Sequence, residues 1–215
     1  MGTANASETE EERWKRAMGE ENYNKYFENV WKGSTSARDG RKKWNDFKAV
    51  LENNMVEAIQ VKAWDLDSSG NWYSYDFEIL VNKNLSSAIK GIMNELYALP
   101  EDERTPIKKA LKSETACGIT YTHNNSCFCL YPRGNGSAHC IGAAVDINPD
   151  QNPMPGQYGD IKNYKPGVDP YSIASTDKIV EIFGKYGFEW GNSYQDYMHF
   201  GYLECVSANM SKYGN

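Results

Sequence analysis

The spacing of apolar residues divides the chain into a helical start and a longer mixed region. From Trp14 to Trp31 large apolar side chains recur at helical intervals, and residues 43–58 carry a second helical pattern. The segment before Trp14 is polar and acidic. We therefore predict a helical N-terminal extension over residues 1–45, disordered at its start, and one folded domain over residues 46–215.

The middle of the chain has the pattern of a β-hairpin. Between residues 61 and 81, two runs of β-branched and aromatic residues flank a polar turn at residues 67–71. Asp65, Asp67 and Asp76 also have a spacing close to that of an EF-hand calcium loop. An EF-hand needs helices on both sides, whereas these flanks favour strands. We predict a plain hairpin and rank a calcium-dependent adhesion domain last.

The second half of the chain alternates helical and strand-like patterns with loops rich in Gly, Asn, Ser and Pro. The pattern predicts helices over residues 85–99 and 177–186, strands over 118–121, 143–147, 188–190 and 197–203, and long loops over 122–138 and 149–172. Ser175 or Thr176 is the expected N-cap of the second helix. Helices and antiparallel strands in separate blocks predict an α+β fold.

Composition narrows the possible functions. The chain has 215 residues, a net charge of -6 and 40% hydrophobic residues, so it can form a core. No basic stripe stands out, which argues against a nucleic-acid partner. No apolar run reaches the ~18 residues that a membrane span needs. The start of the chain lacks the pattern of a secretory signal.

Five cysteines allow two interpretations. Cys117, Cys127, Cys129 and Cys140 are close in sequence, and Cys205 is remote. Thiolates from the first three could belong to a zinc site. The alternative is one or two disulfides in a secreted domain with at least one thiol left over. A C-x-C pair is not the usual zinc spacing, so we favour disulfides or free thiols, with the pairing open.

Three residues from distant stretches have the chemistry of a catalytic zinc site. Asp146 lies within the apolar run 143–147, where a buried carboxylate needs a cation or hydrogen-bond donors. His199 lies in a strand-like run, and His139 precedes Asp146 by seven residues. Two imidazoles and one carboxylate leave a fourth tetrahedral position for water. Spacing alone leaves open the alternative that these are ordinary hydrogen-bonded residues.

Two further residues are candidates for the chemistry around such a site. Asp196 could act as a general base, but residues three apart in a regular strand point to opposite faces. It can share a site with His199 only if the strand starts after it, with a turn or bulge near Gln195. Arg133, in the loop before His139, is the nearest cation for a developing oxyanion. The alternatives are a turn residue for Asp196 and a solvated charge for Arg133.

Three blocks of the sequence carry a family resemblance. They are Ser137-x-His139-x-x-Gly142-x-Ala144-Val145-Asp146-Ile147-Asn148, Tyr186-Gly187-Phe188-x-Trp190-Gly191 and Asp196-Tyr197-Met198-His199-Phe200. Together they resemble the VanY-type zinc D-alanyl-D-alanine carboxypeptidases, over roughly residues 58–203. The resemblance implies a small α+β domain with flanking helices, in which a mainly antiparallel sheet holds the metal.

The resemblance also implies a role for each of seven residues. These are the Zn²⁺ ligands His139, Asp146 and His199, the general base Asp196, Arg133 for substrate and oxyanion, Ser137 for substrate orientation, and Trp190 lining or backing the site. The implied enzyme releases D-alanine from the stem peptide of peptidoglycan, as a monomer outside the cell or in the wall, with its signal segment not present in this chain.

Two alternatives remain at this point. An endopeptidase that cuts within the stem peptide, for example between L-Ala and D-Glu, would use the same ligands and base. A non-catalytic wall-binding module would keep the metal as a structural element. A structural zinc normally has four protein ligands, and only three are evident, which argues mildly against the module.

Overall fold

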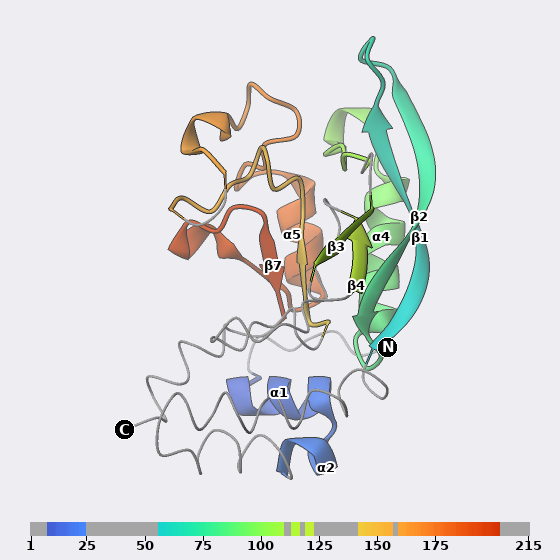
Figure 1. Cartoon of the computed structure of the whole chain (residues 1–215), viewed down its shortest axis with the longest axis vertical. Helices are drawn as coiled ribbons and strands as arrows, with labels where there is room; N and C mark the ends of the chain where they lie inside the picture. Colours follow the sequence, from blue (N-terminus) through green and yellow to red (C-terminus); the bar gives the residue numbers. More distant parts are fainter. Residues whose placement is uncertain are drawn as a thin grey trace.

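The computed structural model describes residues 8–24, 56–109, 113–116, 119–122, 142–156 and 159–202. In these ranges helices flank strands that pair only in antiparallel fashion, so the predicted α+β class is confirmed (Figure 1). The described elements are α1 (Glu10–Met18), α2 (Glu20–Asn22), β1 (Val56–Leu66), β2 (Trp72–Asn82), α4 (Ser86–Ala98), η2 (Glu101–Glu103), β3 (Ser113–Ala116), β4 (Ile119–Thr122), β5 (Ala144–Asp146), η4 (Ile161–Asn163), α5 (Lys178–Lys185), β6 (Glu189–Trp190), η5 (Gly191–Tyr194) and β7 (His199–Gly201).

The described strands form three separate sheets where the sequence predicted one. β1 pairs with β2, β3 with β4, and β7 lies between β5 and β6. One main-chain hydrogen bond, from Asn82 N to Gly142 O at 2.9 Å, joins the end of the hairpin to the residues before β5 without extending a ladder. β3 was not expected from the sequence, whereas β4 overlaps the strand predicted at residues 118–121.

The predicted hairpin is confirmed as β1 and β2, paired from Val56 opposite Asn82 to Leu66 opposite Trp72. Asp67 closes the turn, because its carboxylate accepts from the main-chain N–H of Ser69 at 2.8 Å and of Asn71 at 2.9 Å. Strands on both sides of this turn contradict an EF-hand. The helix predicted over residues 43–58 is wrong at its end, where β1 has begun, and residues 43–55 lie outside the described ranges.

Helices α4 and α5 confirm the two helical patterns in the second half of the chain. The predicted N-cap of α5 is wrong, because the cap is Asp177 rather than Ser175 or Thr176. Asp177 has an extended backbone, and its carboxylate accepts from Ala174 N at 2.8 Å, which closes the turn that leads into the helix. Gly187, at a φ of 84°, follows the end of α5 in the left-handed conformation that glycine adopts without steric cost.

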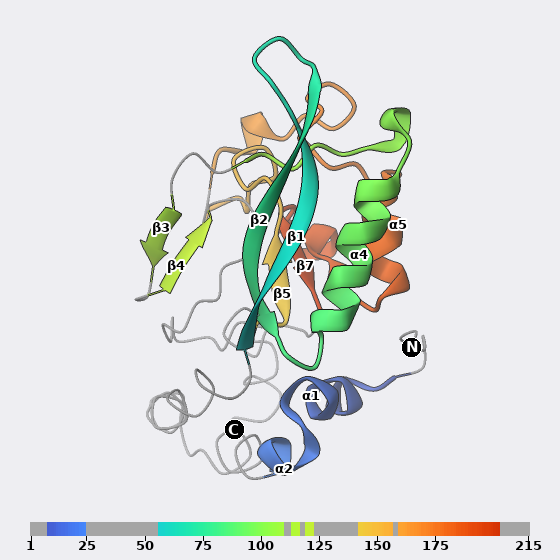
Figure 2. The ribbon, with the colours of Figure 1, turned by 90° about the vertical axis from the view of Figure 1, so that its right-hand side faces the viewer.

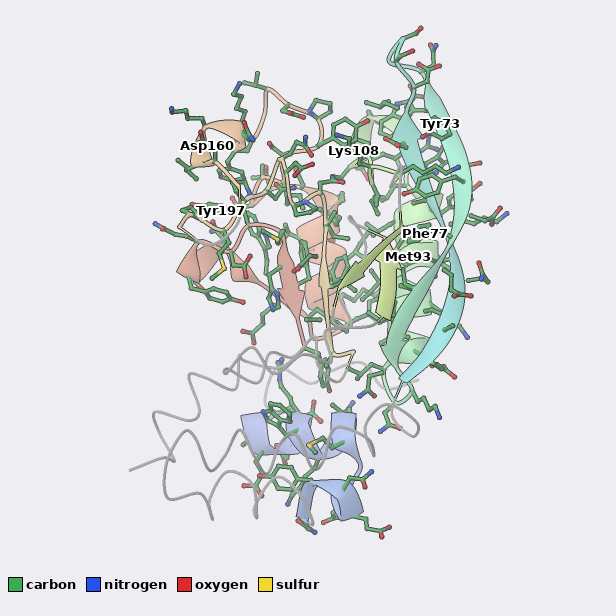
Figure 3. All side chains as sticks on the ribbon, viewed as in Figure 1. Tyr73, Phe77, Met93, Lys108, Asp160 and Tyr197 are labelled. Atoms are coloured by element: carbon green, nitrogen blue, oxygen red, sulfur yellow. The ribbon has the colours of Figure 1, made fainter. Side chains whose placement is uncertain are left out.

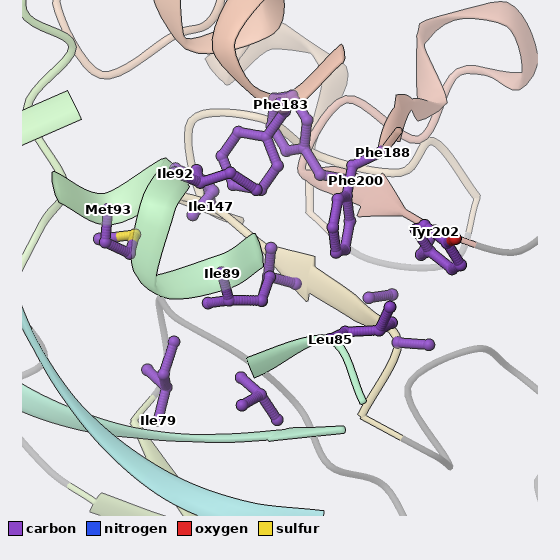
Figure 4. Packing of buried hydrophobic residues seen from close by; sticks show 14 of the residues in the cluster. Ile79, Leu85, Ile89, Ile92, Met93, Ile147, Phe183, Phe188, Phe200 and Tyr202 are labelled. Atoms are coloured by element: carbon purple, nitrogen blue, oxygen red, sulfur yellow. The ribbon is translucent and has the colours of Figure 1, made fainter. Parts of the chain in front are cut away.

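The core lies where α4 packs against the hairpin and α5. Figure 2 shows α4 and α5 side by side, next to the hairpin, with β5 and β7 beyond it. α4 buries an apolar stripe at helical spacing, formed by Ile89, Ile92, Met93 and Leu96. Phe183 of α5 stacks on Phe200 of β7, with ring centroids 4.2 Å apart (Figure 4). The strand that carries His199 is therefore held from behind by the core.

The N-terminal helix α1 packs onto the rest of the fold. It begins at Glu10, earlier than the apolar spacing indicated, because Thr9 and Glu12 form a capping box. Trp14 is buried in the common core, and Ala17 O accepts from the side chain of Asn82 at 2.9 Å. The predicted boundary at residue 45 lies outside the described residues.

The described part of the chain contains no candidate membrane span. None of its helices combines the length and the apolar character that crossing a bilayer requires.

Candidate active site

Two strands far apart in sequence bring Asp146 and His199 together. Asp146 is the last residue of β5 and lies directly opposite His199, the first residue of β7. Nδ1 of His199 is 3.3 Å from Oδ1 of Asp146. The His199 side chain is nearly buried, at 10% exposure, and the Asp146 carboxylate retains partial access to solvent, at 23%. Two of the three predicted metal ligands are thus neighbours in the fold.

The local sequence explains why these two side chains meet. Ala144 and Val145 bury their side chains, so β5 is fixed in the core while its polar end reaches the edge of the sheet. One further hydrogen bond, from Ile147 N to Met198 O at 2.8 Å, continues the pairing past Asp146. Phe200, fully buried, fixes the other side of the pair. A slip of one residue would turn Asp146 and His199 to opposite faces.

Asp196 occupies a turn immediately before β7. Gln195 has a left-handed backbone with a φ of 63°, and the Asp196 N–H donates to Gly191 O at 3.0 Å. The His199 N–H then donates to Asp196 O at 3.2 Å. β7 starts after this turn, so the period-two objection to Asp196 does not apply. The geometry that a shared site requires is present in the backbone.

Gly191 is needed for this turn. A Cβ at that position would lie 2.4 Å from the main-chain oxygen of Asp196, closer than real Cβ contacts come. The glycine at position 191 of the motif block therefore has a steric reason.

Trp190 supports the same turn from behind. Its Nε1–H donates to Tyr197 O at 2.8 Å, and its ring lies 6.4 Å from that of Phe200. The indole N–H of Trp190 is thus engaged by the main chain of this turn.

Aromatic residues that sequence reasoning missed surround this turn. Tyr164, from loop 149–172, stacks on Tyr197 with centroids 3.9 Å apart, and the Tyr197 N–H donates to Pro153 O at 3.4 Å. Burial raises the pKa of Tyr164, so its hydroxyl stays protonated and donates to Ile173 O at 2.9 Å. Tyr194, 55% exposed, has its ring centroid 6.3 Å from that of His199. Tyr194 lies between two of the motif blocks, whereas Tyr164 lies outside all three and had no sequence signal.

The other predicted site residues cannot be placed by this geometry. His139, Arg133, Ser137 and the five cysteines lie outside the described residues. Within the ranges that are described, no group of three His, Cys, Asp or Glu side chains has the arrangement of a metal site. What the structure brings together is the pair Asp146 and His199, with Asp196 one turn away.

The pair has the chemistry and spacing of a partial zinc site. Zinc binds imidazole nitrogen and carboxylate oxygen at about 2.0–2.2 Å, and two such ligands at a tetrahedral angle are about 3.3–3.5 Å apart. The 3.3 Å between Nδ1 and Oδ1 fits that spacing and also fits a direct hydrogen bond. Asp146 and His199 are therefore compatible with a shared ion.

Comparison with known proteins gives a match over the same region. Residues 132–202 match the family model described as D-alanyl-D-alanine carboxypeptidase. The family resemblance is confirmed for that segment. The match covers roughly a third of the chain, and it includes every predicted site residue. Searches of curated proteins and of solved structures found no match. The matched segment supports a peptidase that acts on cell-wall peptides.

Proposed function

We propose that this protein is a zinc-dependent carboxypeptidase that hydrolyses the terminal D-Ala-D-Ala bond of bacterial cell-wall peptides and releases D-alanine. The observation that carries the proposal is the 3.3 Å approach of His199 to Asp146, within the segment that matches the carboxypeptidase family. The substrate would be the stem peptide of peptidoglycan. We expect a monomer that works outside the cell or in the wall.

His139, Asp146 and His199 would hold the zinc ion. This donor set of two imidazoles and one carboxylate is typical of catalytic zinc, which keeps one position open. When bound, zinc supplies a Lewis acid that lowers the pKa of water and polarises a peptide carbonyl. The buried position of His199 keeps its ring orientation fixed, because Tyr197 to Phe200 are held by main-chain bonds and by the core.

Proton transfer falls to Asp196 in this proposal. Hydrolysis adds water across the amide: the C–N bond breaks, the oxygen of water bonds to the carbonyl carbon, and one proton must reach the leaving amine. Asp196 would accept the proton from water and pass it to the amine nitrogen. The turn at Gln195, stabilised by the bond from Asp196 N to Gly191 O, holds this carboxylate next to the start of β7.

Substrate binding would use two residues before β5, and a third residue after it would support the site. Arg133 would pair with the substrate and with the negative charge that develops on the carbonyl oxygen. Ser137 would orient the substrate, and Trp190 would support the site from behind, in line with its bond to Tyr197 O.

Product analysis tests the proposed specificity. The protein is incubated with a muramyl pentapeptide, with and without a chelator, and the products are identified by mass spectrometry. We expect free D-alanine, lost on chelation and restored by added zinc. A peptide product instead of D-alanine would indicate the endopeptidase. Release of D-alanine that a chelator does not affect would overturn the metal mechanism.

Asp196 offers a test that separates an enzyme from a binding module. Asp196→Asn keeps the shape of the side chain but removes the base, so we expect turnover to fall by about 10²–10⁴-fold. Zinc content, measured by elemental analysis, should stay that of the wild type. Asp102→Asn on the exposed η2 is the matched control and should leave turnover unchanged. Unchanged turnover in Asp196→Asn would contradict the assigned role.

A further inference from the structure

We propose that Asp65, on the hairpin, is a positioning residue for the active site: it fixes loop 149–172 and, through Asn148, the end of β5 that carries Asp146. The inference rests on the proposed function only for the meaning of Asp146. Asp65 lies 81 positions before Asp146 and outside the segment that matches the peptidase family. The sequence singled it out only for the calcium-loop spacing that the hairpin contradicts, and its burial is seen only in the structure.

Asp65 is a buried carboxylate with a full set of hydrogen-bond donors. It is 4% exposed. Its Oδ1 accepts from Leu66 N at 2.7 Å and from the hydroxyl of Tyr171 at 2.7 Å. Its Oδ2 accepts from Lys109 N at 2.8 Å and from the hydroxyl of Tyr73 at 2.9 Å. Each oxygen therefore receives one main-chain N–H and one phenol, and the two phenols come from different parts of the fold.

Tyr171 carries the connection from Asp65 to the loop. Its main-chain oxygen accepts from the side-chain amides of Asn148 at 3.2 Å and of Asn152 at 2.9 Å. Asn148 follows Asp146 by two residues, and Asn152 also donates to Ile147 O at 3.2 Å. Both asparagines are fully buried. The end of β5 is thus bonded to the residue that Asp65 holds.

The segment 106–109 closes the network from a second side. Lys108 N donates to Oδ1 of Asn148 at 2.9 Å, and the Asn148 amide donates to Pro106 O at 2.8 Å. Lys109 N, the next residue along the chain, reaches Asp65. Figure 3 labels Tyr73 on the hairpin and Lys108 on this connecting segment. Asp65, Tyr171, Asn148 and the segment form a closed ring of bonds.

The backbone at Asn148 shows why such support is needed. Asn148 has a φ of 47°, a left-handed conformation that asparagine adopts more readily than most residues but that still differs from its preferred backbone regions. Such a conformation persists when the surrounding bonds determine it. All polar atoms of the Asn148 side chain are engaged with residues on the far side of the ring. The network therefore adds to the local tolerance of asparagine in holding the turn directly after Asp146.

The two phenols supply a matched pair of variants. Tyr171→Phe and Tyr73→Phe each remove one hydroxyl bond to Asp65, of nearly equal length, and keep the ring. Tyr73 belongs to the same hairpin as Asp65, so its loss stays within the hairpin. Tyr171 belongs to the loop. If Asp65 positions the loop, only Tyr171→Phe should loosen β5 and residues 148–156.

Hydrogen exchange of the metal-free protein measures this directly. After correction for global stability, we expect amides of residues 143–156 to exchange about tenfold faster in Tyr171→Phe than in Tyr73→Phe, because only the Tyr171 bond joins the Asp65 carboxylate to the loop. Asp65→Asn should loosen both regions, since an NH₂ group at either position would face a main-chain N–H donor. Equal exchange in the two phenylalanine variants, or Asp65→Asn changing only the hairpin, would overturn the proposal.

A second measurement connects the network to the metal site. Loss of a residue that orients a ligand typically weakens metal affinity by about 10–100-fold. We expect zinc affinity, measured by competition with a chelating dye, to fall in Tyr171→Phe and to stay unchanged in Tyr73→Phe. Equal affinity in the two variants would contradict a positioning role. If no stem peptide is cleaved by the wild type, the proposed function fails, while the exchange comparison still decides the role of Asp65.

Discussion

The hairpin and the β5–β7 pair are both antiparallel, yet different forces hold them. β1 and β2 are 11 residues long each and pair without interruption. β5 and β7 have three residues each. The long pair is stabilised by its own ladder and by alternate burial against α4. The short pair depends on Phe200 behind it and on side-chain bonds at its ends.

The difference shows that the long hairpin serves the stability of the fold, whereas the short β5–β7 pair carries the candidate catalytic residues. In the long strand β1, the carboxylate of Asp65 is buried, and both of its oxygens are occupied by hydrogen bonds from other parts of the fold. A short strand ends soon after it enters the core, so Asp146 and His199 can lie at the edge with solvent access for the carboxylate.

The largest effect should come from the short pair. Asp146→Asn keeps the size of the side chain but removes the charge that would face a cation. We expect peptidase activity to fall by about a thousandfold, since several kcal/mol of transition-state stabilisation are lost with the metal. The assay is D-alanine release by the purified protein at limiting zinc. An equally conservative change in the hairpin, Asp76→Asn, should leave the rate unchanged, and a similar loss there would break the comparison.

Two glycines allow the same substitution in each region. Gly191→Ala would place a Cβ 2.4 Å from Asp196 O and displace the turn that carries the proposed base. A shift of about 1 Å in a catalytic group can cost about 100-fold in rate. Gly70→Ala, at the hairpin turn with a φ of 82° and no atom within 4 Å, should cost about 1 kcal/mol of unfolding free energy.

Kinetics and urea unfolding of both glycine variants separate the two outcomes. Gly70→Ala should keep the wild-type rate despite its lower stability. Gly191→Ala should lose rate by more than its stability change accounts for. If both variants lost activity in proportion to stability, the site would have no special geometric demand.

Alkaline pH should weaken the hairpin through Tyr73. Burial, then the hydrogen bond to Asp65 and the charge of that carboxylate, raise the pKa of Tyr73 to about 12 from 10.0. The folded state therefore favours the protonated phenol. This contribution to stability is fully present below pH 10 and is lost as the pH rises from 10 to about 12. Urea unfolding across that window should show a steeper fall for the wild type than for Tyr73→Phe. Identical slopes would contradict the assigned cause.

The smallest effect should come from the exposed face of the hairpin. Lys62 and Asp76 lie opposite each other, with Nζ and Oδ1 3.8 Å apart and both side chains more than half exposed. Exposed pairs of this kind contribute about 0–1 kcal/mol. Lys62→Met should shift the urea midpoint barely and leave activity intact. A loss well above 1 kcal/mol would contradict the minor role of this exposed pair.

Periodic elements were predictable and special turns were not. The hairpin, α4 and α5 follow from the spacing of apolar residues, because one face of each is buried. The start of α1 was missed although the residues of its capping box, Thr9 and Glu12, are present in the sequence. β3 was missed because a strand of four residues is too short to show a clear alternation of apolar and polar positions. The N-cap of α5 was assigned to the wrong residue because Ser175, Thr176 and Asp177 are all suitable caps.

By itself, the sequence determined the α+β class, the hairpin with its turn and the candidates Asp146, Asp196 and His199, because these depend on local spacing and on residue chemistry. Only the tertiary structure decided that Asp146 lies 3.3 Å from His199, that a left-handed turn at Gln195 brings Asp196 to the start of β7, and that Asp65 reaches the end of β5 through Tyr171. Contacts between residues 53 or 106 positions apart depend on how buried faces pack, and no local pattern records that packing.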